Sequence, residues 1–479
     1  MKIASIINGK EFKGKQRETL AVNNPYNQEK VAEISLASIE DLNEAIDNCF
    51  SVFHDTMKKM PAYQRSDILR NTANLMEDRK QSFAETITKE AGKPLKYSLG
   101  EVDRAIQVLR FASEEAKHIN SEVIPMDAAI GGENRLGLTK KVPLGVVAAI
   151  TPFNFPLNLS LHKIAPAIAA GNTIVFKPAE KTPVSAYMLV KLLHEAGLPP
   201  GALNLVLGLG EELGDTLVQH EKVQKVTFTG SLPVGRKIRE NAGFKKITLE
   251  LGSNSPNILF DDVKVGDVVA DLVKGGFAFS GQVCISAQRI YVHQSLYDSF
   301  LEEYVKATEA LVIGDPMDEQ TEFGPMINEE AAERAKQWID DAAAKGAKIQ
   351  TGGKQQGTML TPTIMTNVKN DMKVIAEEVF APIVSVIPFE TEEEVIKLSN
   401  DSIYGLQAGV FTNDLTRAFR VANQLEMGGV WINEISTYRQ DNHPYGGVKQ
   451  SGIGKEGVKY AVEDMTDLKF IGLNLNKPR

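Results

Sequence analysis

Two residues of this chain, Glu250 and Cys284, have types suited to covalent catalysis. Cys284 lies in Phe279-Ser-Gly-Gln-Val-Cys-Ile-Ser286, where small neighbours leave its sulfur uncrowded and reachable by a ligand. Glu250 lies in Thr248-Leu-Glu-Leu-Gly-Ser253, where an apolar run also turns into small residues. A thiolate is a nucleophile, and a carboxylate can act as a general base. The composition of the segment leaves two hypotheses open for Cys284, a nucleophile or a filler of the core.

A third candidate, Asn154, lies in Thr151-Pro-Phe-Asn-Phe-Pro156, directly after the apolar run 145–150. Asparagine between prolines is a common turn former. Alternatively, its amide N–H₂ is a fixed donor for an oxyanion, from which acyl-transfer sites gain much of their rate.

Two glycine turns follow predicted strands and open predicted helices. Gly208-Leu-Gly-Glu-Glu-Leu-Gly214 resembles a dinucleotide fingerprint with one extra residue, and by itself it is weakly specific. Gly230-Ser-Leu-Pro-Val-Gly235 would direct backbone N–H groups and a positive helix end at a phosphate. Two such turns in one sheet favour a nucleotide site over simple strand-to-helix connections.

Lys177-Pro-Ala-Glu180 ends another predicted strand of the same sheet. One interpretation is a solvated strand end. The other gives Lys177 and Glu180 to an adenosine ribose, with the carboxylate accepting from its hydroxyls. Because a carboxylate would repel a 2′-phosphate, the second interpretation favours NAD, although Lys181 leaves NADP open.

These residues are positioned by alternating strands and helices. In residues 140–252, five apolar runs alternate with helical segments, and the pattern repeats in 253–450. Such alternation predicts two α/β domains with parallel, doubly wound sheets, which bind ligands at the carboxyl ends of their strands. The helix after Lys181 is expected to have Thr182 as its cap, Pro183 in its first turn and Gly197 at its end.

Composition narrows the functional classes. The chain has 479 residues, 43% of them apolar and 24% charged, which is typical of a soluble globular protein of two or three domains. A net charge of −9 argues against nucleic acid as a partner. Two cysteines cannot make a disulfide framework, and Cys49, beside Phe50, has neighbours typical of a structural cysteine.

The uncharged run 142–161 is long enough to span a bilayer, but its prolines and asparagines argue against a membrane helix. The N-terminus is too short and polar for a signal peptide. We therefore expect a cytoplasmic protein with no membrane partner and no metal site.

Seven motifs, taken together, carry a resemblance to a known family. They are Phe153-Asn-Phe-Pro156, Lys177-Pro-Ala-Glu180, Phe228-Thr-Gly-Ser231, Leu249-Glu-Leu-Gly252, Gly281-Gln-Val-Cys284, Glu377-Glu-Val-Phe-Ala-Pro382 and Pro444-Tyr-Gly-Gly447. In the order and spacing of these motifs the chain resembles the NAD(P)-dependent aldehyde dehydrogenase superfamily over nearly its whole length. Two departures are mild: Ser253 and Ala381 stand where glycine is common in the family.

The resemblance implies a mechanism. Cys284 as thiolate attacks an aldehyde, Asn154 and the Cys284 backbone N–H hold the oxyanion, hydride passes to nicotinamide, and Glu250 activates water to hydrolyse the thioester. It also implies that Glu378 binds the nicotinamide ribose and that Phe380 packs nearby. The full set of implied cofactor contacts is Thr151, Pro152, Lys177, Glu180, Gly210, Gly214, Gly230, Ser231, Leu251, Glu378 and Phe380.

The family fold implies three parts. Residues 1–120 and 143–252 would form the cofactor domain, 253–455 the catalytic domain, and 121–142 with 456–479 a small β oligomerisation element. Family members are commonly dimers or tetramers, and the strand-like tail 464–473 fits such a role.

The substrate is the least determined feature. The stretch Ser436–His443 should line the substrate mouth and resembles members acting on small polar or anionic aldehydes, such as lactaldehyde, phosphonoacetaldehyde and sulfolactaldehyde dehydrogenases. Arg439 would clamp an anionic group or be a surface arginine. His162 is a substrate contact or a hydrogen-bonded core histidine, and Arg289 a substrate contact or a structural residue.

Two rival functions remain. A CoA-acylating relative would pass the acyl group to CoA, but such members usually lack the glutamate matched by Glu250. A non-catalytic nucleotide-binding or structural relative should have lost Cys284, Asn154 or Glu250, and all three are present.

Overall fold

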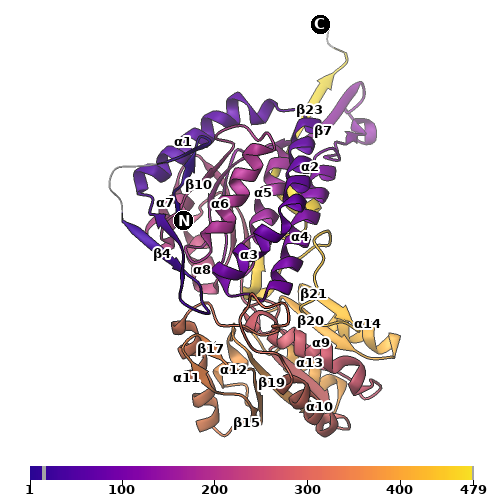
Figure 1. Ribbon diagram of the computed structural model, residues 1–479. Coiled ribbons are helices and arrows are strands. Elements are labelled where there is room, and N and C mark those ends of the chain that lie inside the picture. Colours follow the sequence, from indigo (N-terminus) through magenta and orange to yellow (C-terminus); the bar gives the residue numbers. More distant parts are fainter. Residues whose placement is uncertain (13–17, 477–479) are drawn as a thin grey trace.

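The computed structural model describes residues 1–12 and 18–476, and these form two α/β lobes and a small projecting sheet (Figure 1). The upper lobe is built mainly from the first half of the chain and the lower lobe from the orange second half. Residues 13–17 and 477–479, which the sequence-based division gives to the cofactor domain and the oligomerisation element, lie outside the described residues.

The first lobe is built on an eight-stranded sheet with the order β22-β12-β11-β8-β9-β10-β2-β3. Its five central strands are parallel, and β22, β2 and β3 add antiparallel edges. The strand bounds are β2 Ile6–Ile7, β3 Lys10–Glu11, β8 Val146–Ile150, β9 Thr173–Lys177, β10 Leu203–Leu205, β11 Val223–Thr229, β12 Lys246–Glu250 and β22 Gly452–Ile453.

Helices cover both faces of this sheet, which explains why its central strands read as continuous apolar runs. One buried core joins one sheet face to α2–α6 and α15, and a second joins the other face to α1, α7 and α8. The bounds are α1 Ile39–Asp55, α2 Ala62–Asp78, α3 Lys80–Ala91, α4 Leu95–Glu115, α5 Asn158–Ala170, α6 Pro183–Glu195, α7 Gly210–Gln219, α8 Leu232–Asn241 and α15 Val458–Asp464.

The start of α6 corrects one sequence expectation. Thr182 precedes the helix, but its side chain makes no capping hydrogen bond. The carboxylate of Glu90, from α3, instead accepts from the backbone N–H groups of Val184 at 2.7 Å and Ser185 at 3.1 Å. A residue from another helix therefore satisfies the free N–H groups that a local cap normally serves. Gly197, with φ of +102°, follows the end of α6 as expected.

The second lobe has a seven-stranded sheet with the order β15-β18-β19-β14-β13-β20-β21, parallel except for β15. Buried cores join α9 and α10 to one face and α13 and α14 to the other. The bounds are β13 Pro256–Leu259, α9 Val265–Phe277, β14 Arg289–His293, α10 Tyr297–Glu309, α11 Glu329–Ala344, β15 Lys348–Thr351, β16 Gln355–Gln356, β17 Met359–Leu360, β18 Thr363–Thr366, α12 Lys373–Ala376, β19 Ile383–Phe389, α13 Glu392–Asn400, β20 Gln407–Phe411, α14 Leu415–Gln424 and β21 Gly429–Ile432.

A third sheet combines distant parts of the chain. β23 (Thr466–Asn474) pairs antiparallel along the full length of β7 (Arg135–Pro143), which also pairs with β6 (Val123–Ile124). This is the strand pairing expected for the oligomerisation element, and it projects from the upper lobe in Figure 1. The N-terminal strands β1 (Lys2–Ile3), β4 (Thr19–Asn23) and β5 (Lys30–Ser35) form a further small sheet.

The position of β22 differs from the sequence-based division into domains. This strand lies within the range 253–455 but pairs with β12 of the first sheet, so the chain returns to the first lobe before residue 455.

In the described ranges, every helix is too short or too polar to cross a bilayer.

Candidate active site

Parallel register brings the predicted polar residues of the first lobe to one edge of its sheet. Ile150 lies opposite both Lys177 and Phe228, and Thr229 lies opposite Glu250. The loops that leave these strand ends begin with Thr151, Pro178, Gly230 and Leu251, so the segments singled out in the sequence leave the sheet at the same edge.

Cys284 follows a sharply turned segment of the second lobe. Phe279, Ser280 and Gly281 have φ of +50°, +55° and +67°, which is strained backbone for the first two. A Cβ on Gly281 would lie 2.2 Å from the carbonyl oxygen of Ala381, so glycine is required there. Cys284, three residues after this turn, is only part-buried.

The Asn154 loop meets the Cys284 loop directly. Asn154 Nδ2 donates to the carbonyl oxygen of Gln282 at 2.9 Å, two residues before the cysteine. The Asn154 Oδ1 accepts from the backbone N–H of Phe155 at 3.1 Å, which fixes the orientation of the amide. The structure thus brings Asn154 and Cys284 together from the two lobes. Asn154 itself precedes α5 and is not on the helix that carries His162.

A buried lysine, which the sequence analysis missed, joins the same two loops. Lys93 lies with Nζ 3.8 Å from the ring centroid of Phe155 and 4.7 Å from that of Phe279. Its ion-pair partner is Glu101, whose Oε1 accepts from the first backbone N–H groups of α5, at 2.9 and 3.1 Å. In the sequence, Lys93 lies in Gly92-Lys-Pro94, a segment between two helices that gives no local sign of this role.

Glu250, at the end of β12, is buried and has no hydrogen-bonding partner for either carboxylate oxygen among the described residues. Burial, together with the negative charge of Glu456, raises its pKa well above the ordinary value. Gly446 lies close: a Cβ there would approach Glu250 Oε1 to 2.7 Å. A buried, unpartnered carboxylate of this kind is typical of a group that acts on a ligand or water.

Glu456 lies in the same cluster but is fully paired. Its Oε1 accepts from Lys163 Nζ at 2.7 Å and its Oε2 from Arg439 Nη2 at 2.9 Å. Burial opposes ionisation of Glu456, but the two cations outweigh it and hold its pKa far below the usual range. Lys163 also donates to Thr229 Oγ1 at 2.7 Å, which ties α5 to the end of β11.

Of the three predicted substrate residues, two lie in this cluster. Arg439 is nearly buried, and among the described residues only its Nη2 has acceptors; its Nε is buried without one. His162 bonds to Asp441 at 2.7 Å through Nε2, while its Nδ1 is buried without a partner. Arg104 also pairs with Asp441, at 2.6 Å. Polar atoms of Arg439 and His162 thus lack a hydrogen-bonding partner among the described residues.

Arg289 differs from the other two. Its guanidinium donates to the backbone carbonyl oxygens of Asn254 at 2.7 Å, Leu398 at 3.2 Å and Ser399 at 3.1 Å, and it is fully buried. These bonds tie the loop after β12 to α13, which supports the structural interpretation of this residue.

The glycine turns open on a pocket of about 470 Å³, lined by Ile150, Lys177, Glu180, Leu209, Gly210, Gly214, Phe228, Val234 and neighbouring residues. A Cβ on Gly214 would meet nothing within 4 Å, and one on Gly210 only the Lys177 side chain at 3.8 Å, so the backbone is open to a ligand. Lys177 Nζ lies 3.5 Å from Glu180 Oε2. This pocket fits a dinucleotide, because two helix starts, a cation and a carboxylate lie beside an apolar slot.

Two more residues predicted to bind the cofactor, Glu378 and Phe380, contact the loops that follow β12 and β8. Glu378 accepts from the backbone N–H of Ser253 at 3.2 Å, and burial raises its pKa to about 7. A Cβ on Gly252 would lie 2.4 Å from its carboxylate, so that approach needs glycine. Phe380 has φ of +48°, and its ring packs edge-on against that of Phe153, with 5.9 Å between the ring centroids.

The remaining residues predicted to contact the cofactor lie in the loops that follow strands of the first sheet. Ser231 immediately precedes α8, and Gly230 donates its backbone N–H to the Glu250 carbonyl oxygen at 3.0 Å. Leu251 packs against Gly235, and Thr151 Oγ1 lies 3.4 Å from Ser160 Oγ. Pro152 is half-buried in the loop before Asn154.

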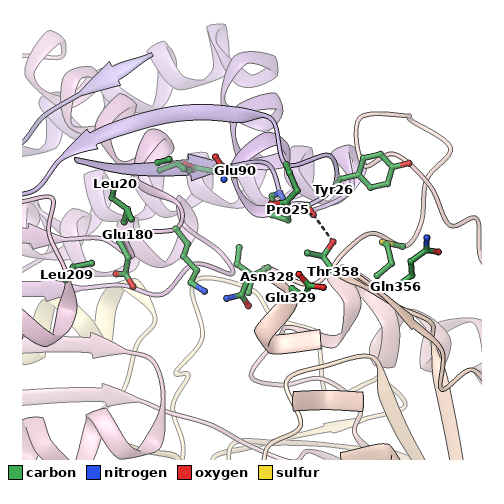
Figure 2. Close-up of a pocket in the computed structure, with 18 residues that line it drawn as sticks. Leu20, Pro25, Tyr26, Glu90, Glu180, Leu209, Asn328, Glu329, Gln356 and Thr358 are labelled. Atoms are coloured by element: carbon green, nitrogen blue, oxygen red, sulfur yellow. Dashed lines mark hydrogen bonds between the residues drawn. The ribbon is translucent and has the colours of Figure 1, made fainter. Parts of the chain in front are cut away.

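A second cavity, of about 980 Å³, adjoins the dinucleotide-like pocket and shares Glu180 and Leu209 with it. Figure 2 shows its walls: the N-terminal segment 20–28 on one side and segments 327–329 and 356–359 of the second lobe on the other. Thr358 Oγ1 donates to the Pro25 carbonyl oxygen across it at 2.8 Å. Cys284, Glu250 and Asn154, the predicted catalytic residues, are not among the residues that line this cavity.

Comparison with known proteins agrees with this arrangement. The family model described as "Aldehyde dehydrogenase family" matches residues 12–471. A 3-sulfolactaldehyde dehydrogenase of Priestia aryabhattai is 48% identical over 458 residues, which cover 96% of this chain and 95% of the relative.

Two solved structures extend the likeness to the fold. Aldehyde dehydrogenase 21 from Physcomitrella patens, in complex with the reaction product succinate, is 39% identical with a TM-score of 0.96 and covers 100% of this chain and 99% of its own. Glyceraldehyde-3-phosphate dehydrogenase GapN from Methanocaldococcus jannaschii, complexed with NADP, is 42% identical with a TM-score of 0.92. The match covers 97% of this chain and 100% of that one. The chain therefore belongs to the aldehyde dehydrogenase family, whose members oxidise aldehydes with NAD(P).

Proposed function

We propose that the protein oxidises a short, polar aldehyde to its carboxylic acid through a thioester on Cys284, which water activated by Glu250 hydrolyses. The observation that carries the proposal is the buried Glu250 carboxylate, without a partner among the described residues, whose charge acts on the Cys284 thiol. A base that is free and close to a nucleophile is what thioester hydrolysis requires.

In the first step the Cys284 thiolate attacks the aldehyde carbon, and the negative charge moves to the aldehyde oxygen. The Asn154 amide and the Cys284 backbone N–H hold this oxyanion. Support comes from the 2.9 Å bond that keeps Asn154 against the Cys284 loop. Loss of one such donor typically costs about 10²–10³ in rate.

NAD(P)⁺, when bound, accepts the hydride that leaves the aldehyde carbon as the thioester forms. Lys177 and Glu180 would bind the adenosine ribose, and Glu378 the nicotinamide ribose. Phe380, packed on Phe153, would limit the space beside the reacting carbon. Glu180 favours NAD⁺ because its carboxylate repels a 2′-phosphate; a lower dissociation constant for NAD⁺ than for NADP⁺, measured by fluorescence titration, is the expected result.

In the last step Glu250 removes a proton from water as the water attacks the thioester. General-base catalysis of this kind is worth about 10²–10⁴ in rate. The raised pKa of Glu250 makes its carboxylate a stronger base than an ordinary glutamate, and hydrolysis should accelerate as pH rises through that pKa.

The substrate we propose carries a polar or anionic group beside its aldehyde. Among the described residues, Nη2 is the guanidinium nitrogen of Arg439 that has hydrogen-bond acceptors, and His162 Nδ1 is buried without one; these two side chains support the proposal. The relatives named above act on sulfolactaldehyde or hold succinate, both anionic. Arg439→Met should raise KM for anionic aldehydes far more than for propionaldehyde. Equal increases in KM for both substrates would contradict the role of Arg439 in binding an anionic group.

We also propose that the protein is a homo-oligomer. Strand β23 exposes four large apolar side chains to solvent, a patch that an assembly would bury. Charged substitutions there should shift the mass measured by light scattering toward the monomer. These side chains are Leu468, Phe470, Ile471 and Leu473.

The test of the enzymatic proposal is NADH formation with a panel of short aldehydes, with wild type beside Cys284→Ala and Glu250→Gln. Steady turnover in wild type, none in Cys284→Ala and a single burst in Glu250→Gln would support the thioester route. Turnover that requires CoA would favour the acylating reaction instead, and cofactor binding without turnover under either condition would favour a non-catalytic relative.

A further inference from the structure

Among the residues that the structure describes, the sulfur of Cys284 has one side-chain partner, the hydroxyl of Tyr445, at 3.1 Å. Tyr445 lies in the turn Pro444-Tyr-Gly-Gly447, and its backbone pairs in both directions with that of Glu456, at 3.0 and 2.6 Å. The ring is almost fully buried. The hydroxyl is therefore held against the sulfur by fixed backbone on one side and close packing on the other.

A cation lies on the face of the same ring. The Arg439 guanidinium carbon is 3.6 Å from the Tyr445 ring centroid, and Arg439 is anchored by its 2.9 Å bond to Glu456 Oε2. A positive charge over an aromatic face stabilises negative charge at its rim, which makes the phenol O–H a better hydrogen-bond donor. Burial raises the pKa of Tyr445 well above its ordinary value, so the phenol keeps its proton.

The sulfur needs this assistance because the other groups around it oppose ionisation. Burial raises the pKa of the Cys284 thiol to about 11, and the carboxylates of Glu378 and Glu250 act in the same direction. Tyr445 and Arg439 are the two groups that act in the opposite direction. Since the thiolate is the reacting form, these two groups decide how much nucleophile is present near neutral pH.

We propose that Tyr445 is a further catalytic residue of the proposed reaction, which donates a hydrogen bond to the Cys284 thiolate, and that Arg439 is the positioning residue that orients and polarises it. The thiol proton leaves to water before the attack, and Tyr445 keeps its own proton throughout. Tyr445 therefore stabilises the nucleophile without acting as a base. This inference deepens the thioester mechanism and rests on Cys284 being its nucleophile.

The test is the rate at which iodoacetamide alkylates Cys284, measured against pH by peptide mass spectrometry with no aldehyde present. Loss of one hydrogen bond to a charged group corresponds to about one pKa unit or slightly more. Tyr445→Phe should therefore move the midpoint of the profile up by about one unit and slow alkylation near neutral pH about tenfold. The plateau at high pH, where the sulfur is fully ionised, should stay unchanged.

Controls separate this role from a structural one. Peptide analysis distinguishes Cys284 from Cys49, whose pKa burial raises to about 12. Tyr63→Phe, the same change on an exposed side chain of α2, should leave the profile unchanged. Arg439→Lys, which keeps a charge near the ring, should shift the midpoint less than Arg439→Met.

A Tyr445→Phe profile that superimposes on that of wild type, or moves to lower pH, would overturn the proposal. So would a loss of rate that persists on the high-pH plateau, because that would indicate altered access to the sulfur. Since alkylation needs no turnover, these outcomes are distinguishable from a failure of the proposed reaction, which would appear only in the aldehyde assay.

Discussion

The regions around Glu250 and Glu456 contain the same functional group in the same buried cluster, yet they give it opposite properties. Glu250, at the end of β12, has no partner among the described residues and a raised pKa. Glu456, just before α15, binds Lys163 and Arg439 and has a lowered pKa. Burial is common to both, so the partners make the difference. A buried carboxylate with two cations is a structural anchor, and one with none is available for proton transfer.

The largest expected effect comes from removing the free carboxylate. Glu250→Gln should lower the steady-state rate by about 10²–10⁴ because water then attacks the thioester without a base. The first turnover should remain fast, so stopped-flow absorbance should record a burst of NADH followed by a slow phase. Glu250→Gln with a slow first turnover and no burst would mean that Glu250 acts before hydrolysis.

For stability the order should be reversed, and replacing Glu456 should cost more unfolding free energy than replacing Glu250. Glu456→Gln leaves two buried cations without a counter-charge, and breaking such a buried pair costs about 3–5 kcal/mol of unfolding free energy. Glu250→Gln removes a buried charge that has no partner, so its unfolding free energy at pH 8 should equal or exceed that of wild type. Denaturant unfolding of both variants at one pH measures this contrast, and equal losses would contradict it.

The pH dependence of hydrolysis tests whether the two carboxylates are coupled. The negative charge of Glu456 raises the pKa of Glu250, while Arg439 and Lys163 lower it. Glu456→Gln removes the first effect and keeps the others. The rising limb of the hydrolysis rate should therefore move to lower pH. A limb that stays in place would show that the two groups titrate independently.

The raised pKa of Glu250 also makes the unfolding free energy depend on pH. Because the folded pKa of Glu250 is above its unfolded value, its favourable contribution is complete below about pH 4.5 and is lost as pH rises through the raised pKa. Glu250→Gln should remove this loss, so the gap in unfolding free energy between variant and wild type should widen with pH. A constant gap would contradict the assignment.

A smaller effect should come from Glu90, a third buried glutamate that is neither free nor paired with a cation. Its carboxylate accepts from the backbone N–H groups at the start of α6. Glu90→Ala leaves these donors buried and unsatisfied, which should cost about 1–3 kcal/mol of unfolding free energy. Thr182→Ala is the matched control: the hydroxyl makes no capping bond, so the change should cost less unfolding free energy than Glu90→Ala. Reversed magnitudes would restore Thr182 as the cap.

Much of the fold could be predicted from sequence because its strands are covered on both faces. Such strands appear as continuous apolar runs, and the five runs predicted within residues 140–252 are confirmed as β8, β9, β10, β11 and β12. The C-terminal strand pairs with residues 135–143, nearly all of which fall in the range 121–142 that was assigned with it to one small β element. Family membership, which rested on the joint order of the motifs, is confirmed.

The contacts that tune the site could not be predicted, since each joins residues far apart in the chain. Lys93 lies between Phe155 and Phe279, Glu90 serves α6, and Lys163 meets Glu456. None of these lysines or glutamates differs locally from a solvated one. Thr182 had the right type for a cap, yet tertiary structure supplied a better acceptor from α3.

The covalent state of Cys284 is the most direct test of the account. Glu250→Gln would be mixed with aldehyde and NAD⁺, quenched in acid and digested, and the peptide containing Cys284 weighed by mass spectrometry. The account predicts an acyl group on Cys284 in nearly every subunit, formed as fast as the NADH burst and absent from Cys284→Ala. A burst of NADH with an unmodified Cys284, or full turnover by Cys284→Ala, would contradict it.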